Sequence, residues 1–395
     1  MSLPMTSSDL STIDLISRLV SFDTTSRNSN LDIIGFIEDY LDRQGVTSIR
    51  VDYRAGSKTN LYATIGPDGP GGIVLSGHTD VVPVDGQDWS SDPFTLTERN
   101  GALYGRGTAD MKGFLAVALA AVPMFKAALL KRPIHLAFSC DEEVGCRGVR
   151  PLIQHIAEHL PKPAAVIVGE PTMMQVVDMH KTALSFETEV TGREAHSSAA
   201  HQGVNAIMMA GELIQKLNRI QRELIARADR SLGFDPPYTT VSIGTITGGT
   251  AKNIVPRRCG FVWETRLLPG DDPGEVPEKL RKFADKILPE MKAVAEEASI
   301  LTRIFNSVPG LKPDTASPAL NLALQLTGEN DKSAVSYATE AGLFQEAGMA
   351  AIICGPGSIE QAHKPDEFIA RGELERCEGF MRRLAQYCAR DKPGS

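Results

Sequence analysis

The chain has 395 residues, 42% of them hydrophobic and 23% charged, which is the composition of an ordinary globular protein with room for two or more domains. Its formal net charge of −8 argues against nonspecific binding to nucleic acid or to an anionic membrane. The six cysteines are scattered and form neither a disulfide framework nor a CxxC zinc pair, so we expect a reducing, cytoplasmic environment.

No membrane or targeting segment is expected. The longest apolar stretch, FLAVALAAVPMF, is too short to span a bilayer and contains a proline. The first residues, MSLPMTSSDL, lack the basic region followed by an apolar one that marks a signal peptide.

The first part of the chain alternates helices and strands. Residues 31–44 have a helical period, because Ile33, Ile34, Ile37 and Leu41 share one face. Further helices are predicted over residues 9–20, 112–130 and 148–158, and strands over residues 49–53, 60–66, 72–77, 134–139 and 164–170. This alternation, up to about residue 180, indicates a layered α/β domain.

The pattern changes after Lys181. Strands are predicted over residues 184–192, 238–249, 258–270 and 299–305, and helices over residues 203–228 and 273–297. Their order, β-α-β-β-α-β, is that of a ferredoxin-like unit with helices on one side of a small sheet. We therefore predict an α/β chain of two domains: a first domain over residues 1–181, completed by residues 309–395, and an inserted domain over residues 182–308.

Histidine and acidic residues recur just past the apolar strands of the first domain. The set comprises His78, Asp80, Asp110, Glu142, Glu143, Glu170 and His363. Because the carboxyl ends of parallel strands meet at one crevice, we expect these side chains to converge. Each motif alone is more often a solvated loop, but four of them at consecutive strand ends, with a late histidine, favour a site.

So many carboxylates cannot lie together without a compensating cation, because burying even one lone carboxylate costs several kcal/mol. Imidazole and carboxylate ligands without thiolate suit Zn²⁺, and Co²⁺ or Mn²⁺ less well. Five candidate ligands are too many for one four-coordinate ion. Two metals that share a carboxylate, about 3.5–4 Å apart, fit the count better.

The motifs SGHTDVVPV, GRGTADMKG, DEEVG, VGEPT and AHKPDE, in this order, resemble those of the M20 metallopeptidase and deacylase family. The resemblance covers nearly the whole chain, including TGREAHSSAAHQGVNAI in the inserted domain. It implies a zinc-exopeptidase-like α/β catalytic domain and an inserted domain that serves as a lid and as a dimerisation surface.

The resemblance also implies a ligand set for two Zn²⁺ ions, with Co²⁺ as an alternative. His78, Glu170 and His363 correspond to terminal ligands, Asp110 to the bridging ligand, and Glu143 to the residue that completes the second site. The family pattern further implies that the peptide bond after Asp110 is cis.

The remaining functional residues follow from the same resemblance or from local chemistry. Glu142 corresponds to the general base, Asp80 to the carboxylate that orients His78, and His196 to an oxyanion donor from a partner subunit. Asn253 and Arg266 match positions that face the substrate. In CGPGS, Gly355 and Gly357 offer backbone N–H groups for a substrate carboxylate, and Glu340 is a candidate for the amine end. No role is assigned to His180 or His201.

Three functions remain open. The first is removal of the acetyl group from N2-acetyl-L-ornithine in arginine biosynthesis, by a homodimer that pairs through the inserted domain. The second is the same chemistry on another N-acyl substrate, such as succinyl-diaminopimelate, N-acetylcitrulline or a dipeptide. The third is a metal-binding protein without catalysis, which the loss of Glu142 or Asp110 would have favoured; both are present.

Overall fold

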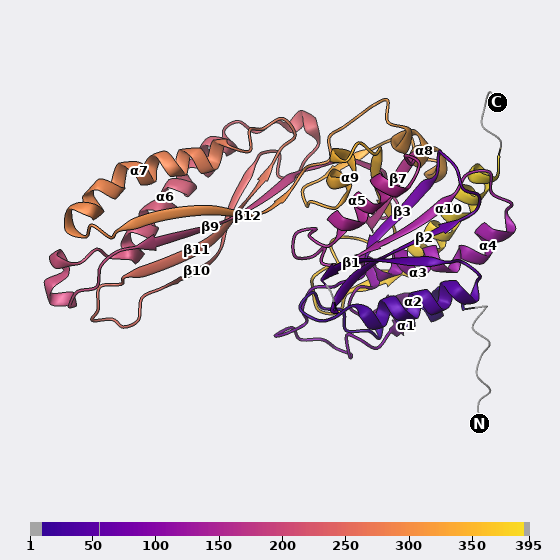
Figure 1. Cartoon of the computed structure of the whole chain (residues 1–395), viewed down its shortest axis with the longest axis horizontal. Coiled ribbons are helices and arrows are strands. Elements are labelled where there is room, and N and C mark those ends of the chain that lie inside the picture. The colour runs from indigo at the N-terminus through magenta and orange to yellow at the C-terminus, as the bar shows by residue number, and fades with distance from the viewer. Residues whose placement is uncertain (1–9, 55, 391–395) are drawn as a thin grey trace. The chain divides into compact units, whose positions relative to one another are not determined.

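The computed structural model describes residues 10–54 and 56–390 and divides them into two compact units (Figure 1). Unit 1 contains the described residues up to Asp178, together with Leu311–Ser333 and the chain from Thr339 onward. Unit 2 contains Met179–Gly310 and Ala334–Ala338. That the units are a catalytic domain and a lid stays a prediction.

An eight-stranded sheet organises unit 1, in the order β1-β2-β6-β3-β7-β14-β8-β13. The strands are β1 (Ser48–Arg54), β2 (Lys58–Ile65), β3 (Ile73–His78), β6 (Ile134–Ser139), β7 (Ala165–Pro171), β8 (Val177–His180), β13 (Ser333–Val335) and β14 (Ala351–Gly355). The central strands β6, β3, β7 and β14 are mutually parallel and buried along their whole length. Parallel strands covered on both faces are expected to be mainly apolar, and in these strands most residues are, with polar side chains such as His78 and Glu170 near the carboxyl ends.

Helices cover both faces of this sheet. They are α1 (Thr12–Val20), α2 (Leu31–Arg43), α3 (Gly113–Ala120), α4 (Val122–Ala127), α5 (Val149–His159), α8 (Pro318–Thr327), α9 (Ala341–Glu346) and α10 (Arg371–Ala389). Successive residues of β3 identify the two sides. A Cβ on Gly77 would touch Leu115 in α3 and Met111 just before it, whereas the Ser76 hydroxyl donates to Glu340 at the start of α9.

The helix predicted over residues 112–130 is wrong in its bounds. It is divided into a tight turn, η1 (Thr108–Lys112), followed by α3 and α4. Asp110 and Met111 have non-helical dihedral angles, and the peptide bond between them is cis, as the family pattern implied. Pro123, near the start of α4, ends the run of helical hydrogen bonds because it has no N–H.

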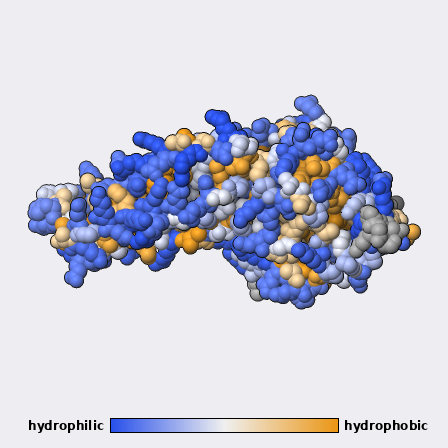
Figure 2. All heavy atoms as spheres, turned by 90° about the horizontal axis from the view of Figure 1, so that it is seen from above, coloured by the Kyte–Doolittle hydropathy of each residue, from blue (hydrophilic) through white to orange (hydrophobic). Residues whose placement is uncertain are grey.

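One stretch of the described residues, Thr108–Ala127, is long and apolar enough to cross a membrane by length and composition. Its apolar window is 83% buried inside the protein itself. A helix that is apolar all round is expected in the core of a large protein, and α3 occupies such a position between α1 and α10. Figure 2 shows hydrophilic residues over most of the visible surface.

A second, three-stranded sheet in unit 1 supports the turn η1. Its order is β15-β5-β4, with β4 (Thr97–Arg99), β5 (Ala102–Tyr104) and β15 (Phe368–Ala370) all antiparallel. Strand β5 leads into η1, and β15 follows the loop that carries His363. The small sheet therefore joins two segments that are far apart in sequence.

Unit 2 has the β-α-β-β-α-β order that the sequence predicts. The elements are β9 (Thr182–Thr191), η2 (Ser197–Gln202), α6 (Ala206–Ile225), η3 (Arg230–Leu232), β10 (Thr240–Gly248), β11 (Arg258–Leu267), α7 (Glu275–Val294) and β12 (Ser299–Val308). The four strands form an antiparallel sheet in the order β10-β11-β9-β12, and α6 and α7 lie over one face of it (Figure 1). Trp263 lies in the core beneath them, and its ring stacks on that of Phe186 with the ring centroids 4.2 Å apart.

Candidate metal centre

The predicted metal ligands gather at the carboxyl ends of the central strands of unit 1. His78 is the last residue of β3, and Glu170 lies near the end of β7. Glu143 follows β6, and His363 follows β14. Asp110 comes from η1. The topology thus explains how five residues from distant motifs meet.

Three of these residues form a buried group. His78, Asp110 and Glu170 offer ligand atoms that all lie within 4.8 Å of one another. The Nε2 atom of His78 lies 3.0 Å from Oδ1 of Asp110 and 3.9 Å from Oε1 of Glu170. The Nδ1 atom of His78 donates to the backbone carbonyl of Asp80 at 2.8 Å, so Nε2 is the nitrogen directed at the group.

A second group shares Asp110 with the first. Asp110, Glu143 and His363 also offer ligand atoms within 4.8 Å of one another. The Nε2 atom of His363 lies 3.4 Å from Oδ2 of Asp110 and 3.1 Å from Oε2 of Glu143. The two oxygens of Asp110 therefore face different histidines, which is the arrangement of a carboxylate that bridges two ions.

The electrostatics of the cluster fit a cation. Burial raises the pKa of Glu170 well above its ordinary value, and raises that of Glu143 to about 7. Burial also acts to raise the pKa of Asp110, but hydrogen bonds with the imidazoles of His363 and His78 hold it well below its usual range. Carboxylates and imidazoles directed at common points are the donors that a divalent ion prefers.

The sequence predicts that the carboxylate of Asp80 orients His78, but the structure gives this carboxylate other partners. Its Oδ1 lies 3.8 Å from His78 Nδ1, too far for a hydrogen bond, because the Asp80 backbone carbonyl takes that proton. Its carboxylate instead accepts the backbone N–H groups of Glu142 at 3.1 Å and Glu143 at 3.2 Å. It also accepts the Ser26 hydroxyl at 2.7 Å. Asp80 thus holds the segment that carries both glutamates.

The turn at CDEEVG is held by a buried ion pair. Asp141 has a φ of +52°, and its Oδ1 lies 2.6 Å from the ammonium of Lys58. Both side chains are almost completely buried, so this pair fixes a backbone conformation that a non-glycine residue rarely adopts. Nothing in the sequence pairs Lys58 with Asp141, which is 83 residues away.

Glu142 lies beside the two groups but belongs to neither. Its Oε1 accepts a hydrogen bond from the thiol of Cys146 at 3.0 Å. Burial raises the pKa of Glu142 to about 8, and the charge of Glu143 adds to this effect while that of His78 opposes it. A carboxylate whose pKa lies near neutrality can both take up and release a proton.

The sequence profile of the peptidase family M20/M25/M40 matches residues 74–387, a span that contains both ligand groups and Glu142.

The chain belongs to this family.

Its M20 relatives support both the fold and the reaction class. The acetylornithine deacetylase of Myxococcus xanthus is 36% identical over 379 residues, covering 94% of this chain and 96% of the relative. The M20 family metallo-carboxypeptidase Sso-CP2 from Sulfolobus solfataricus has a TM-score of 0.75 at 21% identity, over 96% of this chain and 99% of that one. The predicted fold class is therefore confirmed, and the chain is a hydrolase that acts on amide bonds.

A third relative bears on the metal content. The Bacillus subtilis YXEP protein, described as a dinuclear metal-binding peptidase of the M20 family, has a TM-score of 0.67 at 17% identity. The similarity covers 95% of this chain and 96% of the Bacillus subtilis chain. At this identity the similarity supports the fold alone. The two ligand groups of this M20 chain are identified from the distances between their own atoms.

Three predicted site residues belong to unit 2. His196 and Asn253 are exposed and adjacent there, since the backbone N–H of Ser197 donates to the Asn253 carbonyl at 3.0 Å. Arg266 lies at the opposite end of β11 from the loop that carries Asn253. Its guanidinium donates to both carboxylate oxygens of Glu264, at 3.2 and 3.1 Å, so in this M20 chain the predicted anchor already has an anionic partner.

The two glycines predicted to bind a substrate carboxylate do not have free N–H groups. The Gly355 N–H donates to the Thr172 hydroxyl at 3.2 Å, and the Gly357 N–H donates to Glu373 at 3.3 Å. Gly355 is required for packing instead, because a Cβ there would lie 2.0 Å from the carbonyl oxygen of Gly169 in β7. The sequence could not separate this close approach of two strands from an open anion site.

Glu340 is not an open anchor for a substrate amine. It is fully buried and accepts hydrogen bonds from Ser76 at 2.6 Å and from Ser139 at 2.8 Å. It therefore ties the ends of β3 and β6 together beneath the site. Of the two histidines left without a role, His180 is buried and donates to the Lys181 carbonyl at 3.0 Å, and His201 is exposed.

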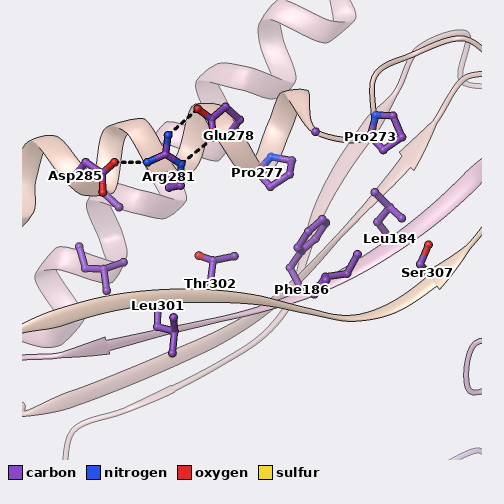
Figure 3. A pocket seen from close by; sticks show the side chains of 14 residues that line it. Leu184, Phe186, Pro273, Pro277, Glu278, Arg281, Asp285, Leu301, Thr302 and Ser307 are labelled. Carbon is purple, nitrogen blue, oxygen red and sulfur yellow. Dashed lines mark hydrogen bonds and ion pairs between the residues drawn. The ribbon is translucent and has the colours of Figure 1, made fainter.

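Unit 2 contains a cavity of about 690 Å³ (Figure 3). It is bounded within unit 2 by α7, β9 and β12, with Phe186 at its base and an Arg281 ion-pair cluster at its rim. No predicted site residue lines it. Its size alone therefore does not identify the place of the chemistry.

Proposed function

We propose that this M20 chain is a di-metal amidohydrolase that removes the acetyl group from N2-acetyl-L-ornithine, giving L-ornithine and acetate in arginine biosynthesis. The substrate rests on the similarity to acetylornithine deacetylases over 94% of the chain. The observation that carries the di-metal chemistry is Asp110, whose Oδ1 and Oδ2 face His78 and His363 respectively.

We assign two Zn²⁺ ions, with Co²⁺ as an alternative. His78, Asp110 and Glu170 would hold one ion, and Asp110, Glu143 and His363 the other. When bound, such a pair lowers the pKa of a water molecule and polarises the acyl oxygen.

Glu142 performs the proton transfers in this proposal. Its carboxylate takes a proton from the attacking water as the new C–O bond forms at the acyl carbon. It then delivers that proton to the amide nitrogen as the C–N bond breaks, so acetate and the free amine leave. The Cys146 thiol, which donates to Oε1, keeps this carboxylate oriented between turnovers.

The residues of unit 2 complete the site. His196 of a partner subunit supplies the hydrogen-bond donor for the oxyanion, and Asn253 and Arg266 face the substrate. This requires a homodimer that pairs through unit 2. We further propose that the enzyme works in the cytoplasm on a small N-acyl amino acid, without a nucleic-acid or membrane partner.

A substrate panel tests the proposal. Metal-loaded protein is incubated with N2-acetyl-L-ornithine, N-acetylcitrulline, succinyl-diaminopimelate and dipeptides, and release of the free amine is measured. We expect the highest kcat/KM on N2-acetyl-L-ornithine. A higher value on another N-acyl substrate would assign the enzyme to that substrate, and hydrolysis of none would overturn the proposed reaction.

A further inference from the structure

A buried carboxylate outside both ligand groups holds the segment that carries Asp110. Glu367 is 1% exposed, and its Oε1 accepts the backbone N–H groups of Ala109 at 2.9 Å and Asp110 at 3.1 Å. Its Oε2 accepts the Gly107 N–H at 3.0 Å and the Arg106 guanidinium at 2.7 Å. Four donors on one carboxylate leave this turn little freedom to move.

A second set of hydrogen bonds continues from this carboxylate to His363. Arg106, itself 1% exposed, also donates to Oε1 of Gln87 at 2.6 Å. Trp89 donates to the same oxygen at 3.0 Å. The amide nitrogen of Gln87 donates to the backbone carbonyl of His363 at 3.0 Å. Glu367 and Gln87 thus connect the two segments through Arg106.

His363 needs such support. Its φ is +64°, in the left-handed region that non-glycine residues adopt uncommonly. Its side chain is 52% exposed, so packing against neighbours does not hold the imidazole. The hydrogen bond from Gln87 acts on the backbone of this residue and resists its return to an ordinary conformation.

We propose that Glu367, Arg106 and Gln87 are positioning residues that set the separation of Asp110 and His363 and so keep the second ligand group ready for its ion. None of the three contributes a ligand atom to either group. The charges of Arg106 and Glu367 cancel, so the network orients the ligands without adding net charge to them. The inference rests on the proposed di-metal function.

The test is metal titration of the full-length, metal-free protein with Zn²⁺ by calorimetry. Gln87→Met keeps the length of the side chain but removes its contacts with Arg106 and His363. We expect this variant to bind one of the two zinc ions with an affinity about 10–100-fold lower, and to bind the other with unchanged affinity. Glu367→Gln should lower the affinity for both ions, because Asp110 belongs to both groups.

Asp178→Asn is the matched control. Asp178 is also a buried carboxylate of unit 1 with a cationic partner, Lys332, and no hydrogen bond or ion pair described for its side chain involves a ligand residue or the Glu367 network. We expect both ions to bind this variant as they bind the wild type. Thermal unfolding of each metal-free variant reports the fold, and Gln87→Met decides the matter if Glu367→Gln does not fold.

The outcomes separate this inference from the function on which it rests. Two ions bound with wild-type affinity by folded Gln87→Met and Glu367→Gln would overturn the positioning network alone. A wild-type chain that binds two ions but hydrolyses no N-acyl substrate would overturn only the proposed reaction. A wild-type chain that binds no divalent ion would overturn both.

Discussion

Glu142 and Glu143 are adjacent in sequence but have different partners. The carboxylate of Glu143 lies 3.1 Å from His363 and belongs to a ligand group. The carboxylate of Glu142 accepts only the Cys146 thiol among the hydrogen bonds described for its side chain. This difference supports the proposal that Glu143 binds metal and Glu142 transfers protons.

Replacement of Glu142 by Gln is expected to abolish turnover while two metal ions stay bound. The amide has the size of the carboxylate but cannot accept the proton of water, and general-base catalysis contributes about 10²–10⁴-fold. Elemental analysis and kcat on the preferred substrate measure the two effects. Glu143→Gln is the control and should lose metal; near-normal kcat in Glu142→Gln would show that the base lies elsewhere.

Glu142 and His363 should each make the metal-free protein less stable as pH rises. Burial raises the folded-state pKa of Glu142 from 4.5 to about 8, and hydrogen bonds with Asp110 and Glu143 raise that of His363 from 6.5 to about 10. Between the unfolded and folded values the folded chain holds more protons than the unfolded one. Stability is therefore lost from about pH 5 to 8 through Glu142 and from about pH 7 to 10 through His363.

Melting temperatures from about pH 5 to pH 9, with and without bound metal, test this expectation. Metal binding requires the deprotonated carboxylates and the neutral imidazoles, so the stabilisation by metal should widen as pH rises. The metal-free Glu142→Gln variant should show a shallower decline, because it lacks one of the titrating groups. A Glu142→Gln variant whose melting temperature changes with pH in the same way as that of the metal-free wild type would contradict the argument.

At the residue scale, sequence predicts which side chains meet but not how each is used. His78, Glu143, Glu170 and His363 could be placed because each follows an apolar strand. The carboxylate of Asp80 could not, since its hydrogen bonds to two backbone N–H groups depend on a turn held by Lys58. Contacts between distant segments leave no local signal in the sequence.

At the element scale, the packing of β14 against β7 requires a residue without a side chain at position 355. Gly355→Ala should destabilise unit 1 by about 1–3 kcal/mol, because its Cβ would lie 2.0 Å from the Gly169 carbonyl oxygen and backbone cannot easily yield. Urea unfolding of the metal-free protein measures the change. Gly372→Ala in α10 is the control, since a Cβ there meets nothing within 4 Å and should be neutral or slightly stabilising. Equal stabilities would refute the packing argument.

Long, strongly patterned elements are those that sequence predicts best. The helix predicted over residues 31–44 is α2 (Leu31–Arg43), and that over residues 273–297 contains α7 (Glu275–Val294). The strands β4, β5 and β15 escaped prediction because three residues are too few to show a period. The break in the helix at residues 121–123 was missed because apolar composition continues across it.

At the scale of the whole molecule, the change from alternating α/β segments to a β-α-β-β-α-β block is visible in the sequence, and unit 2 has this topology. Its strand order follows from the fold type rather than from any residue pattern. The association of two chains cannot be derived from the pattern either, because it depends on a surface and not on a periodicity.

Mixing two inactive variants tests the shared site. Glu142→Gln and His196→Ala are each expected to be inactive, but a mixed dimer contains one site with both residues intact. After subunit exchange at equal concentrations, random pairing should restore about one quarter of the wild-type activity. Light scattering confirms the dimer. Exchange without recovered activity would place the function of His196 within its own subunit, and an active monomer would remove the dimer altogether.

The burial of α3 has a consequence for how the chain matures on the ribosome. This helix packs against α1, which is made first, and against α10, which is made last among the described elements. The apolar side of α3 that α10 covers therefore stays open throughout elongation, whereas the sheet of unit 2 is complete once Val308 has emerged. Unit 2 is begun second and finished first. A nascent chain halted before Arg371 would offer the bare side of α3 to chaperones.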